Sequence, residues 1–139
     1  MKQAFHTLTV STNGPGLYDC TAGMEKFLTA EKVSDGLLTC FIRHTSASLL
    51  IQENADPDVQ KDLQDFFAHL AKNGMNYRHT AEGPDDMPNH IRSALTQTSI
   101  AIPVRGGKTV LGTWQGLYVF EHRDAPHRRE VLFHYIGTD

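Results

Sequence analysis

Two histidines in one polar stretch are the residues of this sequence with the clearest potential for chemistry. His79 and His90 lie eleven positions apart, and the carboxylates Glu82, Asp85 and Asp86 lie between them. Carboxylates are rarely buried without a partner, so this stretch is not typical of a protein core. It is typical of a loop that presents metal ligands or acid–base groups, with His90 just inside the start of a helix.

A third histidine, His44, shares the context of this pair. It ends an apolar strand and precedes the hydroxyl run 45–48, so it also lies where a regular element meets a polar segment. Loops at such junctions present side chains from a rigid frame. Three imidazoles, from His44, His79 and His90, leave one position of a tetrahedral ion open, as in catalytic zinc sites. The spacing is not the short His-Glu-x-x-His type, so a metal site and an acid–base site both stay open.

The neighbouring carboxylates have two possible roles. Asp86 or Glu82 could supply an oxygen ligand, or could orient an imidazole through a hydrogen bond to its other nitrogen. We favour the supporting role, or contact with a substrate, for Asp86.

Several other polar residues are candidates for binding an anion or a ligand. The hydroxyls of Thr45 and Ser46 could donate to phosphate or cap the local backbone. Arg105 begins a Gly-Gly turn that could hold an anion or simply close a hairpin. Trp114 is expected in the core, but the glycines on either side of the 113–115 segment would allow a ligand or another chain to approach Gln115 closely. The segment 122–130 is locally basic, and a solvated loop and an anion site are the two interpretations.

Composition restricts the class of protein. The chain of 139 residues has a formal net charge of -3 and no basic stripe, so we expect no nucleic-acid partner. No apolar run approaches the roughly 20 residues needed to cross a bilayer, and no leader is recognisable, so we expect a cytoplasmic protein without membrane contact. Cys20 and Cys40 are expected to be reduced thiols in the core.

Periodicity predicts a mixed fold. Asp56-Pro57-Asp58 opens the clearest helix, and its apolar stripe is expected to pack on the core. That stripe comprises Val59, Leu63, Phe66, Phe67 and Leu70. A helix containing residues 20–28 and a short one from about 88 to 95 complete the helical set. Strands are predicted at 3–10, 37–44, 49–51, 98–104, 109–111, 117–121 and 129–136. Interspersed helices and hairpins indicate an α+β class, with residues 1–139 as one domain.

The motifs together resemble one known family, the YjbQ-like proteins, also described as secondary thiamine-phosphate synthases. The resemblance covers about nine-tenths of the chain in the same order. It rests on the following segments: His44-Thr-Ser-Ala-Ser48, Glu53-Asn-Ala-Asp-Pro57, Tyr77-Arg-His79, Asp85-Asp-Met-Pro-Asn-His-Ile-Arg-Ser93, Ser99-Ile-Ala-Ile-Pro103, Leu111-Gly-Thr-Trp-Gln-Gly-Leu117, Glu121 and Arg128-Arg129. The Gly-Thr-Trp-Gln element is the most diagnostic of these.

The resemblance implies a curved, mostly antiparallel sheet with about three helices, a homotrimer, and a histidine cluster that looks like a metal site. His44, His79 and His90 map onto that cluster. The activity proposed for the family joins a pyrimidine-methyl diphosphate to a thiazole phosphate, giving thiamine phosphate and pyrophosphate, as a secondary activity. Arg105 or Arg129 would then help to hold the diphosphate.

Donor chemistry bears on the cofactor and on the reaction. Imidazoles suit zinc-like transition metals, whereas magnesium prefers oxygen ligands, so we expect a divalent metal of the zinc type. Thiamine phosphate synthesis is therefore doubtful as the primary task. A metal-dependent hydrolase of a small phosphorylated molecule, and a non-catalytic ligand-binding module at a trimer interface, are the alternatives.

Overall fold

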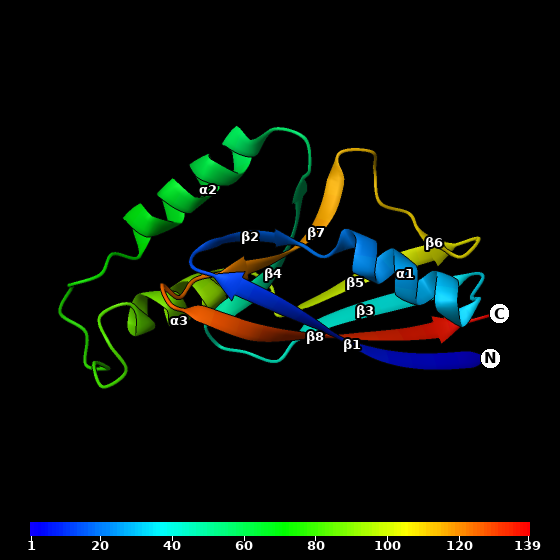
Figure 1. Ribbon diagram of the computed structural model, residues 1–139, viewed down its shortest axis with the longest axis horizontal. Helices are drawn as coiled ribbons and strands as arrows, with labels where there is room; N and C mark the ends of the chain where they lie inside the picture. Colours follow the sequence, from blue (N-terminus) through cyan, green and yellow to red (C-terminus); the bar gives the residue numbers. More distant parts are fainter.

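The computed structural model describes residues 1–139 and contains eight strands and three helices (Figure 1). In chain order the elements are β1 (Lys2–Asn13), β2 (Gly16–Asp19), α1 (Thr21–Glu31), β3 (Gly36–Ile42), β4 (Ala47–Glu53), α2 (Pro57–Leu70), α3 (Asp86–Leu95), β5 (Ser99–Arg105), β6 (Lys108–Thr109), β7 (Gln115–Glu121) and β8 (Pro126–Gly137). Every predicted helix and strand is present except the strand at 109–111, of which only Thr109 lies in a strand, as the last residue of β6. The short strand β2 was not predicted.

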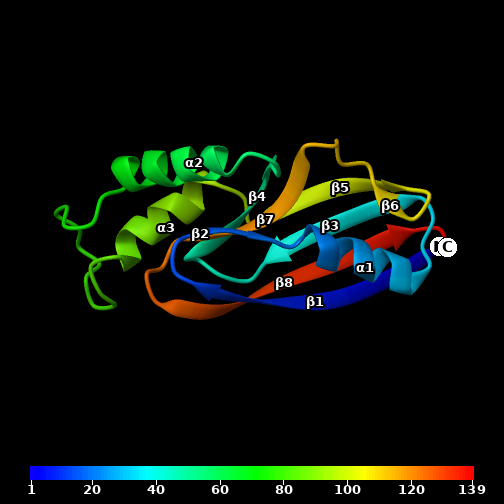
Figure 2. The ribbon, with the colours of Figure 1, turned by 45° about the horizontal axis from the view of Figure 1, so that its top comes forward.

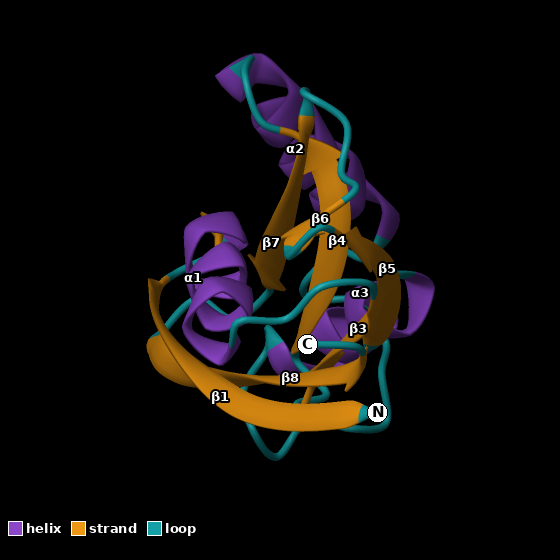
Figure 3. Cartoon of the chain, turned by 90° about the vertical axis from the view of Figure 1, so that its right-hand side faces the viewer, coloured by secondary structure: helices purple, strands orange, loops and turns teal.

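The strands form two antiparallel sheets. The larger has the order β1-β8-β3-β5-β6, and the smaller has the order β2-β7-β4. Figure 2 shows the long strands of the larger sheet running side by side with a pronounced twist, and Figure 3 shows β1 and β8 curving around one side of the molecule. This is the predicted α+β fold with a curved antiparallel sheet.

The core lies between the two sheets and helix α1. Met24, Phe27 and Leu28 of α1 are buried against apolar residues of both sheets, among them Phe133 and Leu117. Cys20 and Cys40 are free thiols in this core, as predicted, and burial raises the pKa of each to about 12. A thiol with so high a pKa stays protonated at neutral pH and is unreactive.

Helix α2 begins as predicted but does not pack as predicted. The Asp56 side chain accepts a hydrogen bond from the Asp58 N–H at 2.9 Å, and Pro57 is the first helical residue. No residue of α2 is buried, and Phe66 and Leu70 are 60% and 51% exposed. Figures 1 and 2 show α2 lying beyond the sheets, at the end of the molecule opposite the termini. The apolar stripe is therefore only partly covered, because the sheets end before the helix does.

Helix α3 begins two residues earlier than predicted. Its N-cap is Asp85, and Asp86 is the first helical residue, so Pro88 stands in the first turn and not at its first position. This shift places Asp86 on the helix itself. None of the three helices is long and apolar enough to cross a membrane.

Candidate metal centre

Helix α3 positions two of the candidate functional side chains. Asp86 and His90 are four residues apart, so they lie one above the other on the same face of the helix. Asp86 Oδ2 and His90 Nε2 are 3.0 Å apart. The Asp86 side chain is 2% exposed and that of His90 is 32% exposed. The carboxylate is therefore buried beneath the site, and the imidazole lies partly in contact with solvent.

The loop before α3 delivers the third side chain. His79 Nε2 lies 2.6 Å from the same oxygen of Asp86, and the two imidazole rings are 5.4 Å apart between centroids. One ligand atom from each of His79, Asp86 and His90 lies within 4.8 Å of the others. The side chain of His79 is 41% exposed, so the cluster opens to solvent on that side.

An arginine that the sequence analysis did not single out holds this cluster in place. Arg123 Nη1 donates to Asp86 Oδ1 at 2.6 Å, and Arg123 Nε donates to Asp85 Oδ2 at 3.1 Å. A third donation reaches the carbonyl of Glu82. Arg123 thus leaves the other oxygen of Asp86 free to face the two imidazoles. The segment 122–130 is thus partly a solvent-exposed loop and partly the start of β8 at Pro126, and Arg123 fastens the loop to the cluster.

Both aspartates are held as carboxylates. Burial raises the pKa of Asp86, but the hydrogen bond from His79 and the charges of His90 and Arg123 outweigh it, so the pKa lies below its ordinary range. Burial likewise opposes ionisation of Asp85, and the Asp124 N–H and Arg123 outweigh it. The cluster therefore presents a negative charge to whatever occupies it.

The backbone determines which nitrogen of His90 faces the cluster. His90 Nδ1 lies 3.0 Å from the carbonyl oxygen of Thr45. A carbonyl only accepts, so Nδ1 must carry the proton. In the neutral imidazole, Nε2 then carries a lone pair and no proton. That lone pair is directed at Asp86 Oδ2, which is also an acceptor and lies 3.0 Å away. Two acceptors at this distance need a cation between them, either a second proton on His90 or a metal ion.

The structure does not bring His44 to His79 and His90. Strand β3 ends at Ile42, and the His44 ring turns to β8, where its Nε2 accepts the Glu130 N–H at 2.9 Å. Its Nδ1 lies 3.4 Å from Arg129 Nη1. Burial, then the charge of Arg129, lower the pKa of His44. The Nε2 lone pair of His44 already accepts a backbone hydrogen bond and is not free to bind a metal. Within this chain, the third member of the cluster is Asp86, where His44 had been predicted.

Thr45, Ser46 and Arg129 line a hollow beside His44, as a predicted anion site would require. Arg129 Nη2 donates to Ser46 Oγ at 3.0 Å. Arg129 also forms a buried ion pair with Glu121, with Nε to Oε1 at 2.7 Å and Nη2 to Oε2 at 2.5 Å. The carbonyl of Thr45 links this hollow to the cluster through His90.

Two further candidates lie away from both places. Arg105 is exposed at the end of β5, before the Gly-Gly turn. Gln115 caps its own turn, since its Oε1 accepts the Gly112 N–H at 2.8 Å. Trp114 is 64% exposed and not in the core. Gly112 belongs to this surface turn, whereas Gly116 is buried in β7, where a Cβ would come within 3.2 Å of the Thr21 hydroxyl.

The chain is similar in sequence to several known proteins. Residues 6–138 match the family model described as UPF0047 protein YjbQ-like. A UPF0047 protein of Synechocystis is 51% identical over 137 residues, which are 98% of this chain and 93% of that protein. The UPF0047 protein YjbQ of Escherichia coli is 42% identical over 127 residues, 91% of this chain and 92% of that protein.

A solved structure supports the fold. The crystal structure of a YbjQ-like protein of unknown function from Sulfolobus solfataricus superposes with a TM-score of 0.90 at 22% identity, covering 98% of each chain. The three-helix α+β fold with its curved antiparallel sheet is thus one already seen in a solved protein. On the match to the family model and to the curated relatives, the chain belongs to the YjbQ-like family, UPF0047.

Proposed function

We propose that the chain is a cytoplasmic metal-binding protein that holds a divalent transition metal between His79, Asp86 and His90. The observation that carries this proposal is the orientation of His90, whose Nδ1–H is taken by the carbonyl of Thr45. Its Nε2 lone pair therefore points at a carboxylate oxygen, and a cation between the two removes the repulsion.

The donor set fits a zinc-like ion better than magnesium. Two imidazoles and one carboxylate are ligands that zinc and related metals take in proteins, and they leave a position open. His79 can release Nε2 for a metal, because its proton can move to Nδ1 and its side chain is 41% exposed. When bound, such a metal would supply a Lewis acid for a phosphoryl oxygen.

The reaction we propose is of the thiamine-phosphate-synthase type, as a secondary activity. The bond between the pyrimidine methylene and the diphosphate breaks, and a bond from that carbon to the thiazole nitrogen forms, so no proton has to be removed. The hollow beside His44, which the Thr45 carbonyl links to the cluster, supports a phosphate-bearing substrate. It has a volume of about 550 Å³, contains no carboxylate in its lining, and includes Thr45, Ser46 and two arginines, Arg43 and Arg129.

The same donor set also favours a second candidate, a metal-dependent hydrolase of a small phosphorylated molecule. Two histidines, one carboxylate and an open position are the arrangement of several hydrolytic zinc enzymes. The third candidate is a non-catalytic ligand-binding module in a homotrimer. Its support is the uncovered face of the larger sheet, where Phe5, Leu37 and Phe41 are 63%, 40% and 44% exposed.

Metal titration of the purified chain tests the site. We expect one equivalent of cobalt(II) or zinc to bind, and Asp86→Asn to weaken binding by more than about 100-fold, beyond the range typical of a residue that only supports a ligand. His69→Ala on the exposed side of α2 is the matched control and should bind normally. If no stoichiometric metal binds and His79→Ala leaves activity intact, both enzyme proposals fail.

Incubation with the two precursors separates the reactions. If the chain forms thiamine phosphate and His79→Ala does not, the transferase is supported. If the chain instead releases phosphate from a phosphate monoester supplied alone, the hydrolase is supported. Light scattering tests the assembly, since a mass near 15.5 kDa would contradict the trimer.

A further inference from the structure

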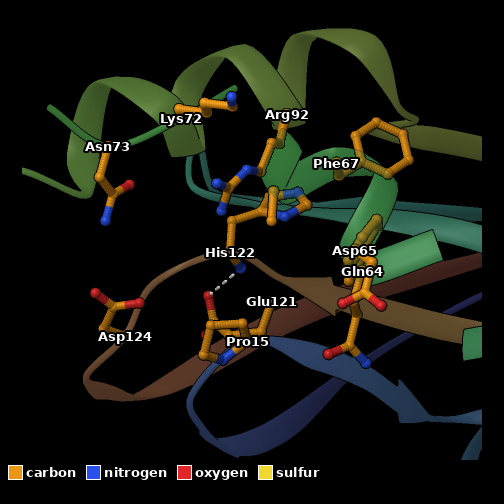
Figure 4. A pocket seen from close by; sticks show the side chains of 12 residues that line it. Pro15, Gln64, Asp65, Phe67, Lys72, Asn73, Arg92, Glu121, His122 and Asp124 are labelled. Atoms are coloured by element: carbon orange, nitrogen blue, oxygen red, sulfur yellow. Dashed lines mark hydrogen bonds between the residues drawn. The ribbon is translucent and has the colours of Figure 1, made fainter. Parts of the chain in front are cut away.

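The buried ion pair between Glu121 and Arg129 contributes one residue to each of two cavities. Glu121 lines a cavity of about 390 Å³ between α2, α3 and the end of β7, whose lining also holds the carboxylates of Asp65 and Asp124 (Figure 4). Arg129 lines the hollow beside His44, which contains no carboxylate. Of the two, the hollow beside His44 is therefore the one whose lining suits an anion.

The backbone determines where the proton of the His44 ring lies. A backbone N–H can only donate, and the Glu130 N–H lies 2.9 Å from His44 Nε2, so this nitrogen carries a lone pair. Burial, then the charge of Arg129, lower the pKa of His44, so the ring is neutral at neutral pH. The single proton of the neutral ring must then lie on Nδ1.

The group next to this Nδ1–H is also a donor. Arg129 Nη1 lies 3.4 Å from His44 Nδ1 and has no other hydrogen-bond partner. The other edge of the guanidinium is used within the fold, since Nε and Nη2 both donate to Glu121. Two N–H donors thus lie side by side with no acceptor between them, the reverse of the arrangement in the metal cluster. One oxygen atom that accepts from both would satisfy the pair.

Ser46 adds a third donor to the same hollow. Its Oγ accepts from Arg129 Nη2 at 3.0 Å, so its own proton is free to be donated. Arg43, an exposed residue of the lining, adds a positive charge. Glu130 follows Arg129 along β8, so its exposed side chain points to the other face of the strand. The hollow therefore presents three donors and an extra positive charge.

We propose that His44 Nδ1–H and Arg129 Nη1–H together hold one oxygen of a phosphate group, and that the Ser46 hydroxyl donates to a second oxygen. Water can satisfy these donors one at a time, but a phosphate oxygen also carries the negative charge that makes hydrogen bonds to an arginine strong. Glu121 grips the guanidinium by its other edge and so keeps Nη1 toward the ring of His44.

This assignment rests on the proposed function, which supplies a phosphate-bearing substrate. It gives His44 the role of a substrate-binding donor in place of the metal ligand expected from the sequence. The metal cluster and the phosphate site then use different histidines, so their failures can be told apart.

The test titrates inorganic phosphate and pyrophosphate into the chelator-treated chain at constant ionic strength. Calorimetry measures the affinity, and the NMR signals of the His44 ring and of the Arg129 guanidinium report where the probe binds. We expect at least one probe to shift both signals. The shifts should be equal in His79→Ala, in which the metal cluster is incomplete.

Variants of His44 test the role of its N–H. His44→Ala should weaken binding of the better probe by at least about tenfold, because a hydrogen bond to a charged group is lost. In His44→Asn an amide N–H can take the place of Nδ1–H, and most of the affinity should return. The exposed His69→Ala and Arg105→Gln are the matched controls and should bind the probe normally.

The two sites should respond to opposite variants. We expect His90→Ala to lose zinc and keep the phosphate probe, and His44→Ala to do the reverse. A chain that binds the probe at His44 but binds no zinc would contradict the proposed metal function and support the phosphate site.

Three results would overturn the phosphate site. The first is the absence of any shift at His44 and Arg129 with either probe up to about 10 mM, a concentration that would reveal even very weak binding. The second is unchanged affinity in His44→Ala. The third is binding that requires zinc and is lost in His90→Ala, which would place the phosphate on the metal.

Discussion

His90 and His44 lie on either side of Thr45, and the backbone uses them in opposite ways. The Thr45 carbonyl accepts from Nδ1 of His90, so the Nε2 lone pair of His90 is directed at Asp86. The Glu130 N–H instead donates to Nε2 of His44, so that lone pair is already used. The two residues are chemically identical, and only the backbone group next to each decides which is available as a ligand.

The partner of one ring nitrogen of a histidine therefore has to be known before the other nitrogen is given a role. A sequence shows where an imidazole lies along the chain but not which backbone group meets it. Glu121 stabilises both regions, because its carboxylate pairs with Arg129 beside His44 and also accepts the backbone N–H of Arg123 at 3.2 Å.

Glu121→Ala should have the largest effect, because it removes the support of both regions. Arg129, which is 4% exposed, would be left as a buried charge without a partner. Breaking such a pair costs about 3–5 kcal/mol, to be measured as the free energy of unfolding in urea. Glu130→Ala, at an exposed neighbouring position, is the control. A loss below about 1 kcal/mol would mean that the pair is not buried in solution.

His90→Ala and His44→Ala test the comparison directly. We expect His90→Ala to weaken metal binding by about 100-fold or more, because a ligand is lost, and His44→Ala to change it by less than about threefold. Calorimetry with zinc measures both. An equal loss in the two variants would show that His44 does reach the metal, as a neighbouring copy of the chain in a trimer would permit.

A third histidine, His122, should make the stability of the fold depend on pH. Its folded pKa of about 3 lies below the ordinary 6.5, owing to burial and the charge of Arg92, with Arg129 adding to the shift and Glu121 opposing it. Between these values the unfolded state binds a proton that the folded state does not. Stability should therefore fall as the pH falls, by about 1.4 kcal/mol per pH unit from this group.

Comparison of variants isolates that contribution. Between about pH 6.5 and pH 4.5, the free energy of unfolding should fall less steeply in His122→Gln than in the unmodified chain. The difference in slope should correspond to the uptake of one proton on unfolding. His69→Gln, at an exposed position of α2, should keep the full slope. Identical slopes in His122→Gln and the unmodified chain would show that the ring titrates normally.

Thr45→Ala should have the smallest effect. The group that orients His90 is the carbonyl of residue 45, which every amino acid provides. Zinc affinity should change by less than about twofold, since the exposed side chain makes no hydrogen bond to the ring. A tenfold loss would mean that the hydroxyl, and not the carbonyl, positions the cluster.

Sequence reasoning paired His79 with His90 from their polar loop and gave Asp86 a supporting role, whereas the structure groups all three side chains. The reason is the helix start: α3 was expected to begin after Asp86, whereas Asp86 is its first residue. The spacing of four between Asp86 and His90 was the available indication, since it places the two on one face of a helix. Arg123 and Arg129 could not be placed from sequence, because their partners come from α3 and β7.

Helix α2 shows a different limit. Its stripe predicted correctly that the segment is helical and amphipathic, and Asp56-Pro57 predicted its start. Periodicity describes one face of a helix but not the length of the surface beneath it. The sheets end too early to cover Phe66 and Leu70, a fact of the whole fold that no local pattern contains.

The sparse packing of α2 has a consequence for motion. An element with no buried residue and few tertiary contacts opens with a lower free energy than the sheets that carry the core. Its backbone amides should therefore exchange with deuterium well before those of β3 or β8. Because Phe67 of this helix packs edge to face on the buried Phe120, the same opening uncovers the end of β7.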